Sequence, residues 1–181
     1  MRLLAQREED LREGQYDVVV VIPSYDEGYR FLRMLESVAV QEGVEDVRTA
    51  VLLVLNNAAD ARPNVRASNE RGQRLVEALW AGEPPADLET NTETHSVSGE
   101  LRIQAFRAVA ASRARLLLMD LFSEGHAPET CNVGIARDEG GRAAARLLKE
   151  RGVIAFSDAD GWYRKTYLSG LRTTYAAGAD A

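Results

Sequence analysis

Short blocks of consecutive apolar residues alternate along the chain with longer segments in which apolar residues recur every three or four positions. The blocks VVVVI, AVLLVL, RLLLM and VIAFS are rich in aliphatic side chains, which favours buried β-strands. The predicted strands are residues 17–22, 50–55, 115–119 and 153–157. Helical spacing predicts helices at residues 28–41, 69–80, 102–112, 134–151 and 163–175, with Gly152 as a C-cap and a short N-terminal amphipathic helix carrying Leu3, Leu4 and Leu11.

Continuous apolar strands that alternate with helices are typical of a mostly parallel sheet with helices on both faces. A length of 181 residues fits one domain, so we predict a single α/β domain over residues 1–181. Residues 82–99 contain two adjacent prolines and many Ser, Thr, Asn and Glu residues. This composition predicts a long exposed loop, and residues 126–131 predict another.

Charge and cysteine content narrow the classes of partner and location. The formal net charge is -6, whereas a protein that follows nucleic-acid phosphates normally has a basic excess, so no nucleic acid is expected. Cys131 is the one cysteine, which excludes an internal disulfide and suits the reducing cytoplasm where we expect the chain. The charged N-terminus lacks the apolar segment of a signal peptide. The apolar runs are far shorter than the ~20 residues of a membrane span.

Polar clusters follow three of the predicted strands. They are residues 23–27 after the first strand, Asn56 and Asn57 after the second, and Asp158 and Asp160 after the last. Ligands of open α/β sheets bind beyond the carboxyl ends of the strands, so we expect these clusters to share one site. Two carboxylates one residue apart can hold Mg²⁺ or Mn²⁺ together with a diphosphate. The alternative for this pair is a solvated turn after a strand.

Four further side chains have both a functional and a structural interpretation. Tyr25 can stack on a planar base and Glu27 can accept hydrogen bonds from a base or ribose; the alternative is a polar strand-to-helix loop. Asn57 offers a donor and an acceptor to a base edge, or forms an Asx-turn that ends the strand. Arg137 near the start of a helix suits an anion, or balances the acidic residues beside it on the surface.

Other catalytic patterns are missing from the sequence. It has no G-x-S-x-G, no G-x-x-x-x-G-K-S/T and no G-x-G-x-x-G after a strand, which removes the main support for hydrolase, P-loop and dinucleotide-binding functions. His95, His126 and Cys131 do not have the spacing of a zinc site.

Four blocks occur in the order VVVVIPSYDEG, VLLVLNNAAD, NVGIARDEGGRAAARLL and GVIAFSDAD, over residues 18–160. This order resembles family 2 glycosyltransferases, in which an aliphatic strand runs into P-x-Y-N/D-E, a second strand ends in D-D or N-N, A-R-N/D-x-G opens a helix, and a strand leads into D-x-D. The resemblance implies a GT-A, Rossmann-like fold and metal-dependent, inverting transfer from a nucleotide-diphosphate sugar to an unknown acceptor. The implied donor-binding residues are Pro23, Tyr25, Glu27, Asn57, Arg137 and Asp158, and the implied ligands of Mn²⁺ or Mg²⁺ are Asp158 and Asp160.

Family members usually continue for roughly 50–150 residues after D-x-D, in a region that supplies the acceptor site and a catalytic base. The chain ends soon after Asp160, and Asp180 is too terminal to be assigned as the base. We therefore expect an incomplete enzyme that binds the donor, without an assigned catalytic residue. A binding module without transfer activity is the alternative. A metal-dependent nucleotidyltransferase is a third candidate, but it would carry a glycine-rich basic loop where PSYDEG stands.

Overall fold

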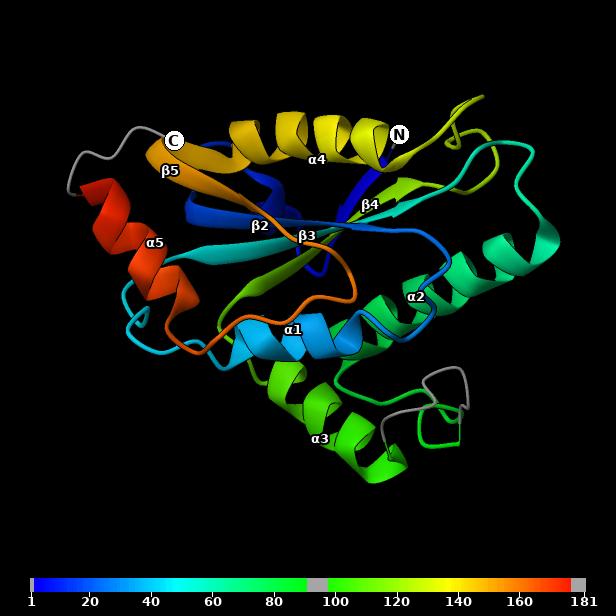
Figure 1. The fold of residues 1–181 in the computed structure, drawn as a ribbon, viewed down its shortest axis with the longest axis horizontal. Helices are drawn as coiled ribbons and strands as arrows, with labels where there is room; N and C mark the ends of the chain where they lie inside the picture. Colours follow the sequence, from blue (N-terminus) through cyan, green and yellow to red (C-terminus); the bar gives the residue numbers. More distant parts are fainter. Residues whose placement is uncertain (1, 91–97, 177–181) are drawn as a thin grey trace.

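The computed structural model describes residues 2–90 and 98–176, and it contains one five-stranded mixed sheet (Figure 1). The strands are β1 (Arg2–Ala5), β2 (Tyr16–Ser24), β3 (Thr49–Asn56), β4 (Arg115–Leu121) and β5 (Leu148–Phe156). Their order across the sheet is β1-β4-β3-β2-β5. β2, β3, β4 and β5 run parallel to one another, and β1 runs antiparallel to β4. The predicted α/β class with a mostly parallel sheet is therefore confirmed at this level.

The strand order reverses direction at β2. From β2 the chain adds β3 and then β4 on one side, and it returns to place β5 on the other side of β2. The carboxyl ends of β2 and β5 thus lie on either side of a topological switch point, which is where open α/β sheets bind ligands.

Helices cover both faces of the sheet, as predicted. They are α1 (Leu32–Ala39), α2 (Pro63–Ala81), α3 (Gly99–Ala110), α4 (Val133–Leu147) and α5 (Tyr167–Ala176). Figure 1 shows α4 on one face and α1, α2 and α3 on the other. Among the described residues, no helix has both the length and the apolar character that crossing a membrane requires.

The side chains of β2 alternate between two cores. Val18, Val20 and Ile22 belong to the cluster with α1, α2 and α3, whereas Val19 and Val21 belong to the cluster with α4. Because successive side chains of a strand point to opposite faces, a strand covered on both sides needs an unbroken apolar run. This explains why the apolar blocks of the sequence predict the strands correctly.

The predicted N-terminal helix is wrong. Arg2–Ala5 forms strand β1, and Glu8–Leu11 forms a single 3-10 turn. Leu3 packs against the α4-side core and Leu4 against the opposite core, which is the alternation of a strand rather than the common face of a helix. Arg2 also pairs with the buried Asp120 of β4 at 3.2 Å. Pairing along the edge of β4 therefore decides the structure of this segment.

Several helix ends differ from prediction. α4 stops at Leu147, because Leu148 pairs with Tyr16 and begins β5, so the predicted C-cap Gly152 lies inside a strand. α1 begins only at Leu32, α5 only at Tyr167, and α2 already at Pro63. α3 begins at Gly99, one residue after its N-cap Ser98, instead of at 102. Residues 82–90 of the predicted loop 82–99 contain no helix or strand, and residues 91–97 of it lie outside the described residues, as does His95.

Candidate functional site

A cavity of about 570 Å³ lies at the switch point, between the carboxyl ends of β2, β3 and β5 and the N-terminus of α4. All three polar clusters that follow the predicted strands contribute to its wall. The lining residues are Pro23, Tyr25, Glu27, Asn56, Cys131, Asn132, Val133, Asp158, Ala159 and Asp160. The sequence-predicted clusters therefore meet at one site, as expected.

The turn after β2 presents Tyr25 and Glu27 to this cavity. Asp26 has φ 58° and Gly28 has φ 52°, so the chain turns back through two left-handed residues before α1 begins. Aspartate adopts this region more readily than most residues, and glycine adopts it freely. Tyr25 remains 52% exposed at the cavity. Its ring is thus free to cover a ligand.

The two aspartates sit on a tight turn after β5. The Gly161 N–H donates to the Asp158 carbonyl at 3.0 Å, and the intervening Ala159 is buried. A Cβ on Gly161 would lie only 3.0 Å from that carbonyl oxygen, so the turn favours glycine there. Burial of Ala159 leaves the Asp158 and Asp160 side chains on the exposed side of the turn.

Arg137 is not among the residues that line the cavity, but it pairs with Asp158, which is one of them. Its Nη2 donates to Asp158 Oδ1 at 2.5 Å, with the two side chains 42% and 66% exposed. The Nε atom of Arg137 is buried and has no hydrogen-bond partner within the described residues. The acidic neighbours Asp138 and Glu139 are paired with Arg142 instead. Arg137 therefore reaches the candidate site through Asp158 rather than balancing the acidic residues of its own helix.

Glu27 is held in an electrostatically unfavourable place. Burial raises the pKa of its carboxyl, and the nearby charges of Asp160 and Asp26 raise it further against the lowering effect of Arg30. Arg30 lies 3.8 Å away and only partly compensates the charge. Glu27 and Asp160 thus concentrate negative charge on one side of the cavity.

Oxygen donors with excess negative charge are the ligand type that Mg²⁺ and Mn²⁺ prefer. Among the described residues, no three His, Cys, Asp or Glu side chains are grouped so as to hold a metal by themselves. A cation shared with a bound diphosphate needs only one or two carboxylates from the protein. Asp160 and Asp158 provide the carboxylate oxygens that a cation shared with a diphosphate requires.

Asn57 does not reach the cavity. It is fully buried, its Nδ2 donates to the carbonyls of Ala58 at 2.9 Å and Phe122 at 3.3 Å, and its Oδ1 accepts from Asn69 at 2.8 Å. Asn56 lines the cavity in its place. The even-numbered residues of β3 face α4, which places Asn56 rather than Asn57 on the side of the sheet where the N-terminus of α4 lines the cavity.

Asn56 is fixed by its neighbours but keeps acceptor capacity. Its Nδ2 donates to the Ser24 carbonyl at 3.1 Å, and its Oδ1 accepts from the Cys131 thiol at 3.5 Å. A thiol is a weak donor and an amide oxygen has two lone pairs. The Oδ1 atom can therefore accept another hydrogen bond from a ligand beside Cys131.

The start of α4 was predicted as a candidate anion site through Arg137, but the residues there that line the cavity are Cys131, Asn132 and Val133, which the sequence did not single out. Asn132 is the N-cap, and its Oδ1 accepts from the Ile135 N–H at 2.9 Å. This capping pattern was readable in the sequence, but its position next to β5 depends on tertiary packing. Burial raises the pKa of the Cys131 thiol, which keeps it protonated at neutral pH. Cys131 is thus a poor nucleophile. The N-terminus of α4 contributes the positive end of the helix dipole to this wall of the cavity.

Comparison with protein-family models, with curated proteins and with solved structures gives no match. Function is therefore inferred from the chemistry of the cavity.

Proposed function

We propose that the chain binds a nucleotide-diphosphate sugar in this cavity and is a glycosyltransferase of GT-A fold, similar to family 2 enzymes. One observation carries the proposal. Tyr25 and Glu27 at the end of β2 line the same cavity as Asp158 and Asp160 at the end of β5, and Arg137 contacts Asp158. An aromatic face for a base and charged groups for a diphosphate are thereby available within one ligand-sized space.

The nucleoside would occupy the side formed by β2 and β3. The half-exposed ring of Tyr25 offers a stacking surface, worth on the order of 1–3 kcal/mol for a base. Asn56 Oδ1 offers an acceptor for an N–H of the base, and Glu27 an acceptor for base or ribose. A volume of about 570 Å³ is within the usual range of small-ligand pockets.

The diphosphate would lie toward β5 and α4. Asp160 and Asp158 would hold Mn²⁺ or Mg²⁺, which when bound supplies positive charge to the leaving diphosphate. Arg137 keeps Asp158 in place and adds a charge of its own, and the N-terminal N–H groups of α4 favour an anion nearby.

In the reaction the acceptor's hydroxyl oxygen bonds to the anomeric carbon of the sugar. The bond from that carbon to the diphosphate oxygen breaks, the nucleoside diphosphate leaves with the electron pair, and the hydroxyl proton passes to a general base. Attack opposite the leaving group inverts the configuration. A module that only binds donors would use the same cavity, and a transfer assay separates the two functions.

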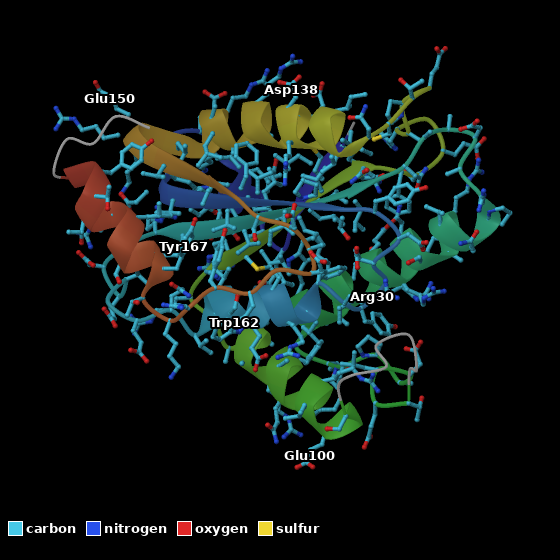
Figure 2. All side chains as sticks on the ribbon, in the orientation of Figure 1. Arg30, Glu100, Asp138, Glu150, Trp162 and Tyr167 are labelled. Carbon is cyan, nitrogen blue, oxygen red and sulfur yellow. The ribbon has the colours of Figure 1, made fainter. Side chains whose placement is uncertain are left out.

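The test is calorimetric titration of UDP and GDP with and without Mn²⁺. We expect Mn²⁺-dependent binding that Asp160→Asn weakens at least about tenfold, because a metal ligand is lost. Asp138→Asn is the matched control, since Asp138 lies on the outer side of α4 (Figure 2). Equal affinity with and without metal, together with parental binding by Asp160→Asn, would falsify the proposal.

Alkylation of Cys131 tests whether the nucleotide binds in this cavity. Cys131 carries the only thiol of the chain and lines the cavity. We expect bound nucleotide with Mn²⁺ to slow the alkylation of the Cys131 thiol at alkaline pH. Mass spectrometry measures the rate of this labelling. If nucleotide binds and the labelling rate stays the same, binding occurs elsewhere.

A further inference from the structure

A second cavity, of about 240 Å³, lies at the edge of the sheet opposite to the candidate site. Tyr16, Thr49 and Arg115, which begin β2, β3 and β4, all line it. The candidate site lies beyond the carboxyl ends of these parallel strands. Because β3 has eight residues and a strand rises ~3.3 Å per residue, its two ends are roughly 23 Å apart. The second cavity is therefore separate from the one proposed to bind the donor.

Three arginines line this second cavity, in a chain whose formal net charge is -6. Arg48 precedes β3, whereas Arg113 and Arg115 lie at the start of β4. Ala50 of β3 pairs with Arg115 of β4, which fixes the two segments next to each other. The fold thus brings together cations that are far apart in the sequence.

Two of the three guanidinium groups have no carboxylate partner in the part of the chain that the structure describes. Arg115 Nε pairs with Asp10 Oδ1 at 3.3 Å. Arg48 Nη2 donates instead to the neutral Oε1 atom of Gln15 at 2.9 Å. The Arg113 side chain is exposed and makes neither an ion pair nor a hydrogen bond with the described residues. Arg48 and Arg113 therefore keep their charge available for a ligand.

The acidic residues around the cavity do not neutralise these two arginines. Asp46 lines the cavity but forms two hydrogen bonds with Arg172, at 2.8 and 2.9 Å. Asp17 accepts the backbone N–H of residue 48, and its side chain is paired with Lys149 at 2.7 Å. Glu45 lines the cavity and accepts a backbone N–H. One exposed carboxylate thus stands against two guanidinium groups, and the cavity keeps a positive charge.

A buried hydroxyl in the same wall also lacks a partner. Thr49 is 7% exposed, and its Oγ1 atom makes no hydrogen bond with the described residues. Most buried polar side-chain atoms in proteins have a partner, so one without a partner needs an explanation, and a ligand is one such explanation. Because Thr49 directly follows Arg48, a ligand oxygen bound beside that arginine can supply the missing hydrogen bond.

We propose that this cavity binds a phosphate group, either free phosphate or the end of a small phosphate ester. A guanidinium group can form two parallel hydrogen bonds to phosphate oxygens, and two guanidinium groups match the double negative charge of a phosphate. The volume of about 240 Å³ lies below the ~300–1,000 Å³ of pockets for larger ligands, so a whole nucleotide-sugar does not fit. The inference goes beyond the proposed function, because it uses no residue of the donor cavity.

The experiment is calorimetric titration of the full chain with inorganic phosphate, glycerol 3-phosphate and acetate at one ionic strength. We expect both phosphates to bind about tenfold more tightly than acetate, which carries a single charge. Tighter binding of glycerol 3-phosphate than of inorganic phosphate identifies an ester as the ligand, and the reverse order identifies the free ion.

Variants of the two unpaired arginines locate the phosphate. Arg48→Ala and Arg113→Ala should each weaken phosphate binding about tenfold, because charge-assisted hydrogen bonds are lost. Arg113→Lys should keep part of the affinity, since the charge remains but the planar fork is lost. Arg107→Ala is the control, because Arg107 is an exposed arginine of α3 outside the cavity lining. All four side chains removed or changed are exposed, and circular dichroism checks that each variant folds.

Asp160→Asn separates this inference from the proposed function. Phosphate should bind to Asp160→Asn as it does to the parent, and UDP or GDP with Mn²⁺ should bind to Arg113→Ala as to the parent. If phosphate binding is lost in Asp160→Asn and kept in Arg113→Ala, the phosphate occupies the donor cavity and the inference is overturned. It is also overturned if no phosphate binds, or if acetate binds equally well. If phosphate binds as expected but nucleotides do not, the proposed function fails and this inference stands.

Discussion

Glu27 is a carboxylate that folding makes harder to ionise. Its pKa is raised by burial first, and then by Asp160 and Asp26 beyond what Arg30 offsets. The folded protein therefore holds this proton more tightly than the unfolded chain does. Its contribution to stability is complete below the ordinary pKa of 4.5 and is lost as the pH rises through the folded value. At neutral pH the ionised Glu27 destabilises the fold.

Glu27→Gln should remove this effect while weakening nucleotide binding. We expect the free energy of unfolding at pH 7 to equal or exceed that of the parent, with a smaller decline between pH 4.5 and pH 7. Urea denaturation across this pH range measures both quantities. Glu124→Gln, an exposed glutamate outside the cavity lining, is the control. A variant clearly less stable than the parent at pH 7 would show that Glu27 is mainly structural.

Arg137 should matter more for binding than for folding. Its ion pair with Asp158 is half exposed on both sides, and such pairs contribute about 0–1 kcal/mol to stability. Arg137→Ala should thus leave the urea midpoint nearly unchanged and weaken nucleoside diphosphate binding about tenfold, because a charge beside the diphosphate is lost. Arg142→Ala is the control, because Arg142 pairs with Asp138 and Glu139 of the same helix and none of the three lines the cavity. It should change neither the urea midpoint nor the binding of nucleoside diphosphate. A large loss of stability in Arg137→Ala contradicts this assignment.

At the scale of elements, α4 depends on close contact with the sheet. A Cβ on Gly140 would lie 2.6 Å from Val21 Cγ1 and 3.0 Å from Val54 Cγ2, both in the core. The helix can therefore approach β2 and β3 only if this position lacks a side chain. That approach brings the N-terminus of α4, with Asn132, to the wall of the cavity.

Gly140→Ala should destabilise the protein by about 1–3 kcal/mol, because the extra methyl group overpacks the interface between α4 and the sheet. Gly170→Ala in α5 is the matched control: a Cβ there meets nothing within 4 Å, so the change should be neutral or stabilising by up to ~1 kcal/mol. Urea denaturation of both variants measures the difference. Equal stability of the two would mean that α4 shifts without loss.

The central elements were predictable because local pattern and tertiary environment agree there. The strand cores of β2, β3 and β4 follow from aliphatic runs buried on both faces. At the edges of the sheet, the local sequence pattern and the tertiary environment no longer agree. Residues 148–152 carry Lys149, Glu150 and Arg151 and favour a helix locally, yet they belong to the exposed edge strand β5, because Leu148 at their start and Val153 after them pair with β2 across a break in register. An edge strand tolerates charge, so the polar pattern does not reveal it.

Prediction of the site from the sequence is limited in the same way, at the level of single residues. Its three strand-end clusters were predictable, because parallel strands end at one edge of a sheet. The choice between Asn56 and Asn57 depends on which face each side chain takes, and a shift of one residue reverses the face. The contribution of residues 131–133 depends on where α4 packs, which the sequence pattern does not encode.

At the scale of the whole molecule, the cavity joins segments that are far apart in the chain. Tyr25 and Asp160 are held together only while β2 and β5 are paired, since both follow those strands directly. A ligand that bridges them binds the folded state and not the unfolded chain. Ligand binding and global stability are therefore linked.

Nucleotide with Mn²⁺ should raise the Tm of the parent protein. At a free concentration of 100 times Kd the folded state gains about 2.7 kcal/mol, which corresponds to roughly 5–10 °C for a domain of this size. Thermal unfolding by circular dichroism, with UDP or GDP and with Mn²⁺ or EDTA, measures the shift. Asp160→Asn and Tyr25→Ala should each reduce it, the first by weakening the metal-dependent part and the second by removing the stacking surface, while Asp138→Asn should keep it. A shift of the same size in Asp160→Asn and Tyr25→Ala would place the ligand outside the cavity, because neither wall would then contribute to its binding.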